Sequence, residues 1–198
     1  MKTSALTKLQ KGFTLVELLV VIAVIGILAT VVLVALNPAE QIARSKDAAR
    51  ETTISQLGRA IQAWQTSKAV SDFANFNTTV GSCTQSATNP CWMDQLVAQN
   101  EIQTKPTVQN SSTAANNCSN ATGTNGMQNN VCFTTTTVNG VANGGVIVWV
   151  NLESSKEKTR ANNCATFAAA VWDSSQGRAG VECLATATTV PAITNTMY

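Results

Sequence analysis

A single carboxylate, Glu17, interrupts an apolar run that extends from Phe13 to Leu36. A charged side chain inside a membrane span costs up to about 3 kcal/mol near the middle of the bilayer and less near its edge. The simplest explanation is that the Glu17 side chain extends to the nearby interface, where water solvates the charge. The residues Lys11-Gly12 directly before the run have the form of a processing point, so the two features need a joint explanation.

The six cysteines all follow the apolar run, in a region rich in Ser, Thr, Asn and Gly: Cys83, Cys91, Cys118, Cys132, Cys164 and Cys183. An even number of cysteines in such a region predicts disulfides and an oxidising compartment. A zinc site is the alternative, but the chain has no Cys-x-x-Cys pair. The first pairings to expect are local, namely Cys83 with Cys91, Cys118 with Cys132, and Cys164 with Cys183 across the last hairpin.

Catalytic chemistry is not indicated. The chain has no histidine, and it shows no nucleophile elbow and no phosphate-binding loop. Its outer acids are scattered, and we expect them to be solvated: Asp72, Asp94, Glu101, Glu153, Asp173 and Glu182. The turn that holds Asp173 could bind calcium, although a plain hairpin turn is the favoured interpretation. We therefore predict no enzyme, no cofactor and no metal, and the absence of basic blocks predicts no specific nucleic-acid partner.

The apolar run predicts a transmembrane helix. At about 1.5 Å per residue it spans roughly 36 Å, against about 30 Å of hydrocarbon. A lone strand in lipid would leave its backbone groups unpaired, so a helix is required. Lysines precede the run and no basic residue follows it until Arg44. The positive-inside rule then places the N-terminus in the cytoplasm and the cysteine-rich part outside, which agrees with the disulfide prediction.

The segment KGFTLVELLVVIAVIGIL, which begins at Lys11, resembles the N-terminus of type IV prepilins and of the pseudopilins of type II secretion. The close resemblance covers residues 11–29, and beyond about residue 68 the chain follows only the general pattern of the family. It implies that a membrane peptidase, the prepilin peptidase, cuts between Gly12 and Phe13 and N-methylates the new amine of Phe13. Thr14 and Glu17, which open the helix, are then expected to serve assembly.

A filament gives Glu17 a cationic partner. Once helices leave the bilayer for a dry filament core, each Phe13 ammonium is a buried cation that needs a counter-charge. The Glu17 carboxylate of a neighbouring subunit is placed to supply it. The resemblance implies a structural subunit that polymerises with itself into an extracellular pilus for adhesion, motility or DNA uptake, driven by an assembly platform and ATPase. A type II secretion pseudopilin is the first alternative, and a membrane-anchored extracellular binding module is the second.

A second helical segment is predicted over residues 37–70. Its apolar residues recur at helical spacing and should carry the outer domain: Ile54, Leu57, Ile61 and Trp64. Charged residues precede this stripe and are expected to form a solvated or intersubunit face, with simple solvation and specific salt bridges both open: Arg44, Lys46, Asp47, Arg50 and Glu51. We expect the helix to break at Asn37 and Pro38, with a softer region near Gly26. Many pilins carry a proline where this chain has Val34, so a kinked but continuous helix stays open.

The predicted organisation has four parts: a cleaved leader over 1–12, a transmembrane and assembly helix over 13–36, an amphipathic helix over 37–70 and an extracellular domain over 71–198. A brief helix is expected over 90–97. Strand patterns begin at about residue 131 and predict consecutive antiparallel strands joined by turns and a charged loop over 153–160: 131–138, 146–152, 164–172 and 181–189. The fold class is α+β, with the sheet packed on the apolar stripe of the second helix.

Overall fold

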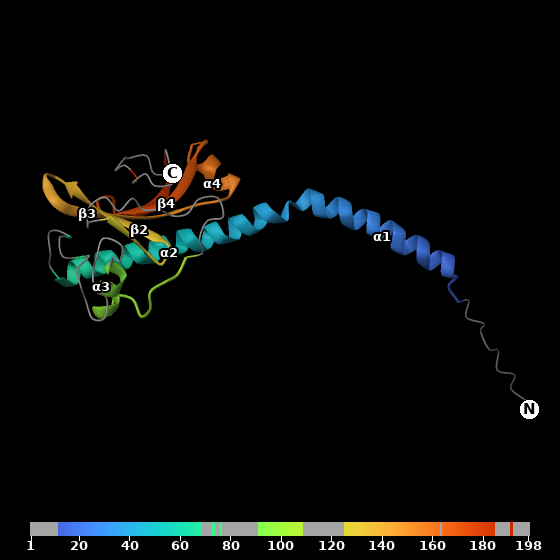
Figure 1. The fold of residues 1–198 in the computed structure, drawn as a ribbon, viewed down its shortest axis with the longest axis horizontal. Helices are drawn as coiled ribbons and strands as arrows, with labels where there is room; N and C mark the ends of the chain where they lie inside the picture. Colours follow the sequence, from blue (N-terminus) through green and yellow to red (C-terminus); the bar gives the residue numbers. More distant parts are fainter. Residues whose placement is uncertain are drawn as a thin grey trace, which may run out of the picture. The chain divides into compact units, whose positions relative to one another are not determined.

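The structure is a computed structural model that describes residues 12–68, 73, 76, 91–108, 125–162, 164–184 and 191. The chain divides into two compact units, Met1–Gln41 and Ile42–Tyr198. We call the second the globular unit. The predicted α+β layout is present, with a long apolar N-terminal helix, a second helix and an antiparallel sheet (Figure 1).

The first helix, α1, spans Leu15–Leu36 and is apolar on all sides, with no buried side chain. It continues unbroken through Gly26. It ends at Asn37, whose backbone is left-handed at φ 40°, a conformation that asparagine tolerates better than most residues. The second helix, α2, begins directly at Pro38 and spans Pro38–Lys68. Proline suits a first helical position because it has no N–H to leave unpaired, so the predicted break falls at Asn37 and Pro38.

The sheet has five antiparallel strands in sequential order (Figure 1). They are β1 (Asn125–Gln128), β2 (Val131–Val138), β3 (Val141–Asn151), β4 (Phe167–Asp173) and β5 (Arg178–Leu184). Two short helices accompany them, α3 (Trp92–Ala98) and α4 (Ser155–Arg160). Each consecutive pair of strands is joined locally, which is why the sheet keeps the order of the sequence.

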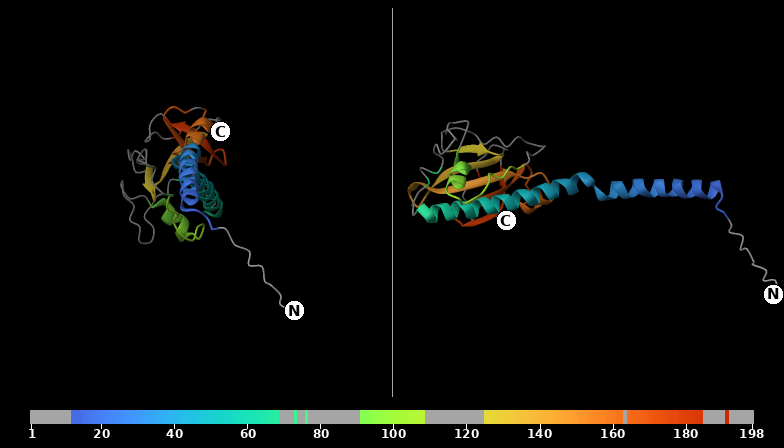
Figure 2. Two further views of the ribbon diagram at one scale, coloured as in Figure 1. Left: turned by 90° about the vertical axis from the view of Figure 1, so that its right-hand side faces the viewer. Right: turned by 90° about the horizontal axis from the view of Figure 1, so that it is seen from below.

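The predicted stripe of α2 packs on one face of the sheet, as Figure 2 shows in its right-hand view. Ile54, Ile61 and Trp64 are at most 5% exposed and share one core with Val148 and Trp172 of the sheet. Strand side chains alternate between faces, and the opposite face carries a second buried cluster: Cys132, Ile147, Trp149, Ala169, Val171 and Leu184. The central strands are therefore apolar on both faces.

Aromatic rings extend the first core toward α3. The Trp64 and Phe76 rings lie 4.8 Å apart between centroids, and the Phe76 and Phe133 rings lie 5.7 Å apart. Trp92, the first residue of α3, stacks on Phe133 at 5.6 Å. These contacts explain why the short apolar sequence around Trp92 forms the brief helix that its pattern predicts.

Several local predictions were wrong. β4 spans Phe167–Asp173 and not 164–172, and β5 spans Arg178–Leu184 and not 181–189. The charged segment 153–160 was expected as a loop, yet it contains α4, because Ser154 caps the helix by accepting a hydrogen bond from the Glu157 amide. The turn expected over 139–145 is reduced to Asn139 and Gly140, both at positive φ, and β3 begins at Val141. Strand β1 was not predicted, since its four residues carry no clear alternation.

Candidate processing and assembly site

Gly12, Phe13 and Thr14 lead into α1 as non-helical backbone. The Phe13 side chain is 88% exposed. A Cβ added to Gly12 would meet no atom within 4 Å, so the peptide bond between Gly12 and Phe13 is flanked by open space on that side. A peptidase can reach a non-helical, uncovered backbone of this kind, whereas a helix would hide the scissile bond in its ladder of hydrogen bonds.

Thr14 and Glu17 form a capping box at the start of α1. The Glu17 amide donates to Thr14 Oγ1 at 3.2 Å, and Glu17 Oε2 accepts from both the Thr14 amide and the Thr14 hydroxyl, each at 2.8 Å. This arrangement satisfies two of the amide groups that a helix N-terminus leaves unpaired. It also fixes the carboxylate beside the first turn, one residue away from the backbone nitrogen of Phe13.

The surface of α1 is apolar apart from Glu17 and Thr30, and none of its residues is buried. Among the described residues, α1 is the one helix long and apolar enough to cross a membrane by length and composition, and none of the tested window is buried. Thr30 sits within this surface, but its hydroxyl donates to the Ile27 carbonyl at 2.7 Å and is satisfied inside the helix. Glu17 is thus the single charged side chain in α1.

Residues 7–33 match the family model of the prokaryotic N-terminal methylation motif. The chain carries the hallmark of the type IV pilin and pseudopilin family. The motif spans the predicted processing point, the capping box and most of α1, and it implies processing by prepilin peptidase and entry into a pilus or pseudopilus system. No curated protein and no solved structure matches the chain.

The predicted residues of the methylation motif lie together at one end of α1: Gly12, Phe13, Thr14 and Glu17. Gly26 lies in the same helix, twelve residues or about 18 Å beyond Thr14. What sequence reasoning missed is the capping box itself. The signal was present, since threonine followed three residues later by glutamate before an apolar run is a helix-start pattern.

Cysteines stabilise the globular unit. Cys164 and Cys183 form the predicted disulfide, with Cα atoms 5.4 Å apart, and it joins the approach to β4 to the end of β5. Cys91 and Cys132 are also disulfide-bonded. Their predicted partners, Cys83 and Cys118, lie outside the described residues.

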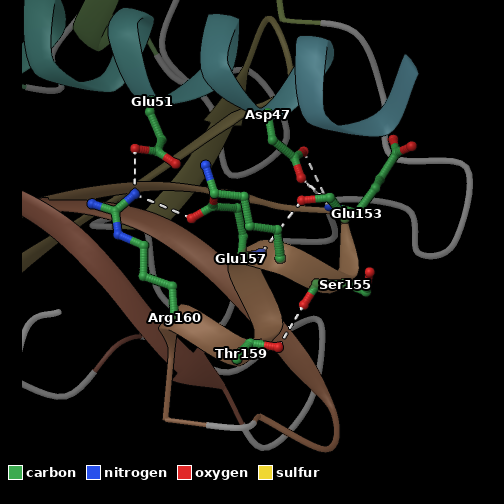
Figure 3. A network of polar contacts seen from close by, with 9 residues as sticks. Asp47, Glu51, Glu153, Ser155, Glu157, Thr159 and Arg160 are labelled. Atoms are coloured by element: carbon green, nitrogen blue, oxygen red, sulfur yellow. Dashed lines mark hydrogen bonds and ion pairs between the residues drawn. The ribbon is translucent and has the colours of Figure 1, made fainter. Parts of the chain in front are cut away.

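A buried ionic group ties α2 to the segment between β3 and α4 (Figure 3). Asp47 and Arg50 are 1% and 2% exposed, and Arg50 bonds Asp47 Oδ1 at 2.8 Å and Glu153 Oε1 at 2.6 Å. The Asp47 carboxylate also accepts from the Glu153 and Ser154 amides at 2.7–3.0 Å. The expected solvated or intersubunit face is wrong for Asp47 and Arg50, which are buried within the chain, and the specific salt bridge is the correct alternative.

A second ionic group lies one turn further along α2 (Figure 3). Arg160 of α4 donates to Glu51 at 2.8 Å and to Glu157 at 3.1 Å. Burial, together with the charge of Glu51, raises the pKa of Glu157 above its ordinary value, and Arg160 partly opposes this shift. The hydrogen bond to Glu51 raises the pKa of Arg160. One guanidinium therefore holds two carboxylates that would otherwise repel each other.

Several outer acids were wrongly expected to be solvated. Glu153 is held by Arg50, and Asp173 and Glu182 are 1% and 9% exposed. Asp173 Oδ1 accepts from the Ser175 amide at 2.7 Å and so shapes the hairpin turn between β4 and β5. Among the described residues no group of three or more Asp, Glu, His or Cys side chains is placed to hold a metal ion.

Proposed function

We propose that this chain is a type IV pilin precursor whose mature form, beginning at Phe13, polymerises into a surface pilus. The single observation that carries the proposal is the position of Glu17. The carboxylate is fixed at the N-terminal end of a helix that exposes apolar side chains on every side.

The apolar surface of α1 has to be shielded from water twice, first in the precursor and then in the polymer. In the precursor, lipid covers it, and the positive-inside pattern keeps the leader in the cytoplasm. In the polymer, identical helices take the place of lipid. Lipid tails are as apolar as leucine, so this exchange gains little from hydrophobic burial, and close packing together with polar contacts must supply the preference.

Glu17 supplies a polar contact of this kind. Cleavage after Gly12 turns the Phe13 nitrogen into an ammonium, which is costly to bury alone. The capping box places the Glu17 carboxylate within one residue of that nitrogen in height along the helix. A neighbour displaced by a few ångströms along its axis brings its own carboxylate to the amine. The pair favours assembly and sets the axial register of the subunits.

A pilus is favoured over a secretion pseudopilus by the construction of the globular unit. Its described cysteines are all disulfide-bonded. A buried ionic group fixes the segment before α4 to α2, and a more exposed one fixes α4 itself. Such stabilisation suits a surface exposed outside the cell. The partners are then the prepilin peptidase, the assembly platform with its ATPase, and further copies of the chain; the precursor resides in the cytoplasmic membrane.

The test separates the charge of Glu17 from its capping role. Glu17→Gln keeps an oxygen that accepts from the Thr14 amide, so the cap survives while the charge is lost. Thr14→Ala is the matched control, because it removes the capping hydroxyl and keeps the charge, at a cost of about 1 kcal/mol to the helix start. Both variants are assayed for cleaved protein in the membrane and for sheared filaments.

We expect Glu17→Gln to be inserted and cleaved normally and to yield few or no filaments. Thr14→Ala should retain a substantial filament yield. A wild-type filament yield from Glu17→Gln would show that the carboxylate only extends to the interface, and it would remove the observation on which the proposal depends.

A further inference from the structure

Two Asn-Gly pairs lie close together in the hairpin of β2 and β3: Asn139-Gly140 and Asn143-Gly144. An asparagine followed by glycine can react with its own backbone. The glycine nitrogen reaches the side-chain carbonyl carbon easily, because glycine has no Cβ to obstruct the approach. The reaction needs no catalyst and depends on access and on local freedom of the chain. The hairpin therefore allows a comparison of the same chemical pair in two surroundings.

The first pair forms the turn itself and is open. Asn139 and Gly140 are exposed, with positive φ angles of 51° and 80°. The turn is closed by Val138 opposite Val141, so the Gly140 amide lies outside the ladder of the strands. Neither the Asn139 side chain nor the Gly140 amide has a hydrogen-bond partner in the described part of the chain. A Cβ added to Gly140 would meet no atom within 4 Å.

The turn is also separated from the regular part of the ladder. The strands pair regularly as far as Thr136 opposite Gly145, and the register shifts between Thr136 and Val138. Residues 142–144 of β3 therefore stand opposite Thr137 alone, which makes this part of the hairpin a bulge. Because a bulge interrupts the ladder, the turn can open locally while the rest of the sheet stays paired.

The second pair lies in this bulge and is restrained. Asn143 Oδ1 accepts from the Thr135 hydroxyl at 2.7 Å, and the Asn143 carbonyl accepts from the Phe73 amide, also at 2.7 Å. Phe73 is 1% exposed and belongs to the first core. A Cβ added to Gly144 would lie 2.9 Å from a backbone oxygen, so this glycine is crowded. Reaction at Asn143 requires these hydrogen bonds to break first.

We propose that Asn139 is a site of spontaneous deamidation, with water as the co-reactant. The Gly140 nitrogen attacks Cγ of Asn139 and closes a cyclic imide, and the side-chain nitrogen leaves as ammonia with the proton that Gly140 gives up. Water then adds to one of the two imide carbonyls and breaks its bond to nitrogen. Opening at Cγ gives aspartate. Opening at the backbone carbonyl gives isoaspartate, in which the chain runs through Cβ.

The consequence for the fold is local. Isoaspartate adds one atom to the backbone of the turn, so the pairing of Val138 with Val141 should be lost. The pairs from Thr136 opposite Gly145 onward lie beyond the bulge and should remain. Modified chains therefore stay folded and carry an additional carboxylate at the turn. The site belongs to the globular unit and does not depend on which filament the chain forms.

The test uses the full wild-type chain in detergent micelles, incubated at mildly alkaline pH in water enriched in heavy oxygen. Digestion follows in ordinary water at acid pH, so the label marks the events that occurred before digestion. Mass spectrometry with electron-transfer fragmentation resolves the two positions and distinguishes isoaspartate from aspartate. We expect labelled isoaspartate and aspartate at position 139. Modification of Asn143 should be about tenfold slower or more, because two hydrogen bonds must break first.

Two controls separate the effect of the fold from that of the sequence. In the reduced and denatured chain, Asn139 and Asn143 should react at similar rates. Thr135→Val removes the hydroxyl that holds Asn143, so the rate at Asn143 should rise about fivefold while the rate at Asn139 stays the same. Near-ultraviolet circular dichroism checks that this variant is folded, and the wild-type comparison stands without it.

The proposal is overturned if position 139 remains an amide in the folded chain while the denatured chain reacts, or if Asn143 reacts as fast as Asn139 in the folded chain. Aspartate without isoaspartate would also contradict it, because direct hydrolysis of the side chain gives aspartate alone. These outcomes leave processing and filament assembly untouched, so a failure here is distinct from a failure of the pilin assignment.

Discussion

The two consecutive helices of this chain use apolar surface in opposite ways. α1 has no buried side chain although nearly every residue is apolar. α2 is polar overall, yet it buries one stripe against the sheet and places Asp47 and Arg50 under the β3–α4 segment. α2 thus forms part of a folded domain, whereas α1 carries an apolar surface that no described residue buries.

Their glycines show the same contrast. A Cβ at Gly26 of α1 would meet nothing within 4 Å, whereas a Cβ at Gly58 of α2 would collide with Trp172. One glycine is constrained by the fold of the single chain. The other glycine has no neighbouring atom in the described part of the chain that would constrain it.

The largest effect is expected at the processing point. Gly12→Val should leave uncleaved precursor in the membrane and no filaments, because a branched side chain obstructs the backbone that the peptidase must grip. Immunoblotting of membrane and sheared fractions measures both. Normal cleavage of this variant would show that the open backbone at Gly12 is unimportant.

Removal of a buried charge should affect the globular unit strongly. Asp47→Ala removes a carboxylate that Arg50 binds and leaves the Glu153 and Ser154 amides without this acceptor, so unfolding should become easier by about 3 kcal/mol. Lys105→Met is the control, since Lys105 is 38% exposed in its pair with Asp94 and should contribute less than about 1 kcal/mol. Thermal unfolding by near-ultraviolet circular dichroism compares the variants. Equal losses of stability in the two variants would contradict the stabilising role of the buried ionic group around Asp47 and Arg50.

The two glycines give a matched pair of smaller effects. Gly58→Ala should destabilise the globular unit by about 1–3 kcal/mol, because overpacking against Trp172 exceeds the helix propensity that alanine adds. Gly26→Ala should leave that stability unchanged and act, if at all, on filament yield. Stabilisation of the globular unit by Gly58→Ala would mean that Trp172 moves aside freely.

The smallest effect is a dependence on pH. Since burial raises the pKa of Glu157 above 4.5, the folded protein binds a proton before the unfolded chain does as the pH falls. Glu157 therefore favours folding increasingly as the pH drops through its raised pKa, and this contribution is lost as the pH rises. Glu157→Gln should remove that slope in denaturant unfolding measured from neutral pH down to about 4.5. If the stability of Glu157→Gln depends on pH as that of the wild-type chain does, another group causes the dependence.

Sequence patterns predicted the elements whose cause is local. The apolar run predicted α1, and the helical spacing that ends at Trp64 predicted the packed face of α2. The strand-forming residues of 131–138 predicted β2 with the bounds that the structure has. The patterns did not reveal the burial of Asp47, because the Glu153 and Ser154 amides that its carboxylate binds lie more than a hundred residues away along the chain. A charge at a helix surface and a charge that will be covered by a distant loop have the same local pattern.

The central claim is that α1 is the assembly surface of a processed pilin. Mass spectrometry of the N-terminal peptide from purified, sheared surface filaments tests it most directly. We predict a peptide that begins at Phe13 and carries one methyl group on its amine. A chain that retains Met1, or one that is cut after Ala35, would contradict the account, because the first keeps the leader and the second removes both Glu17 and nearly all of α1.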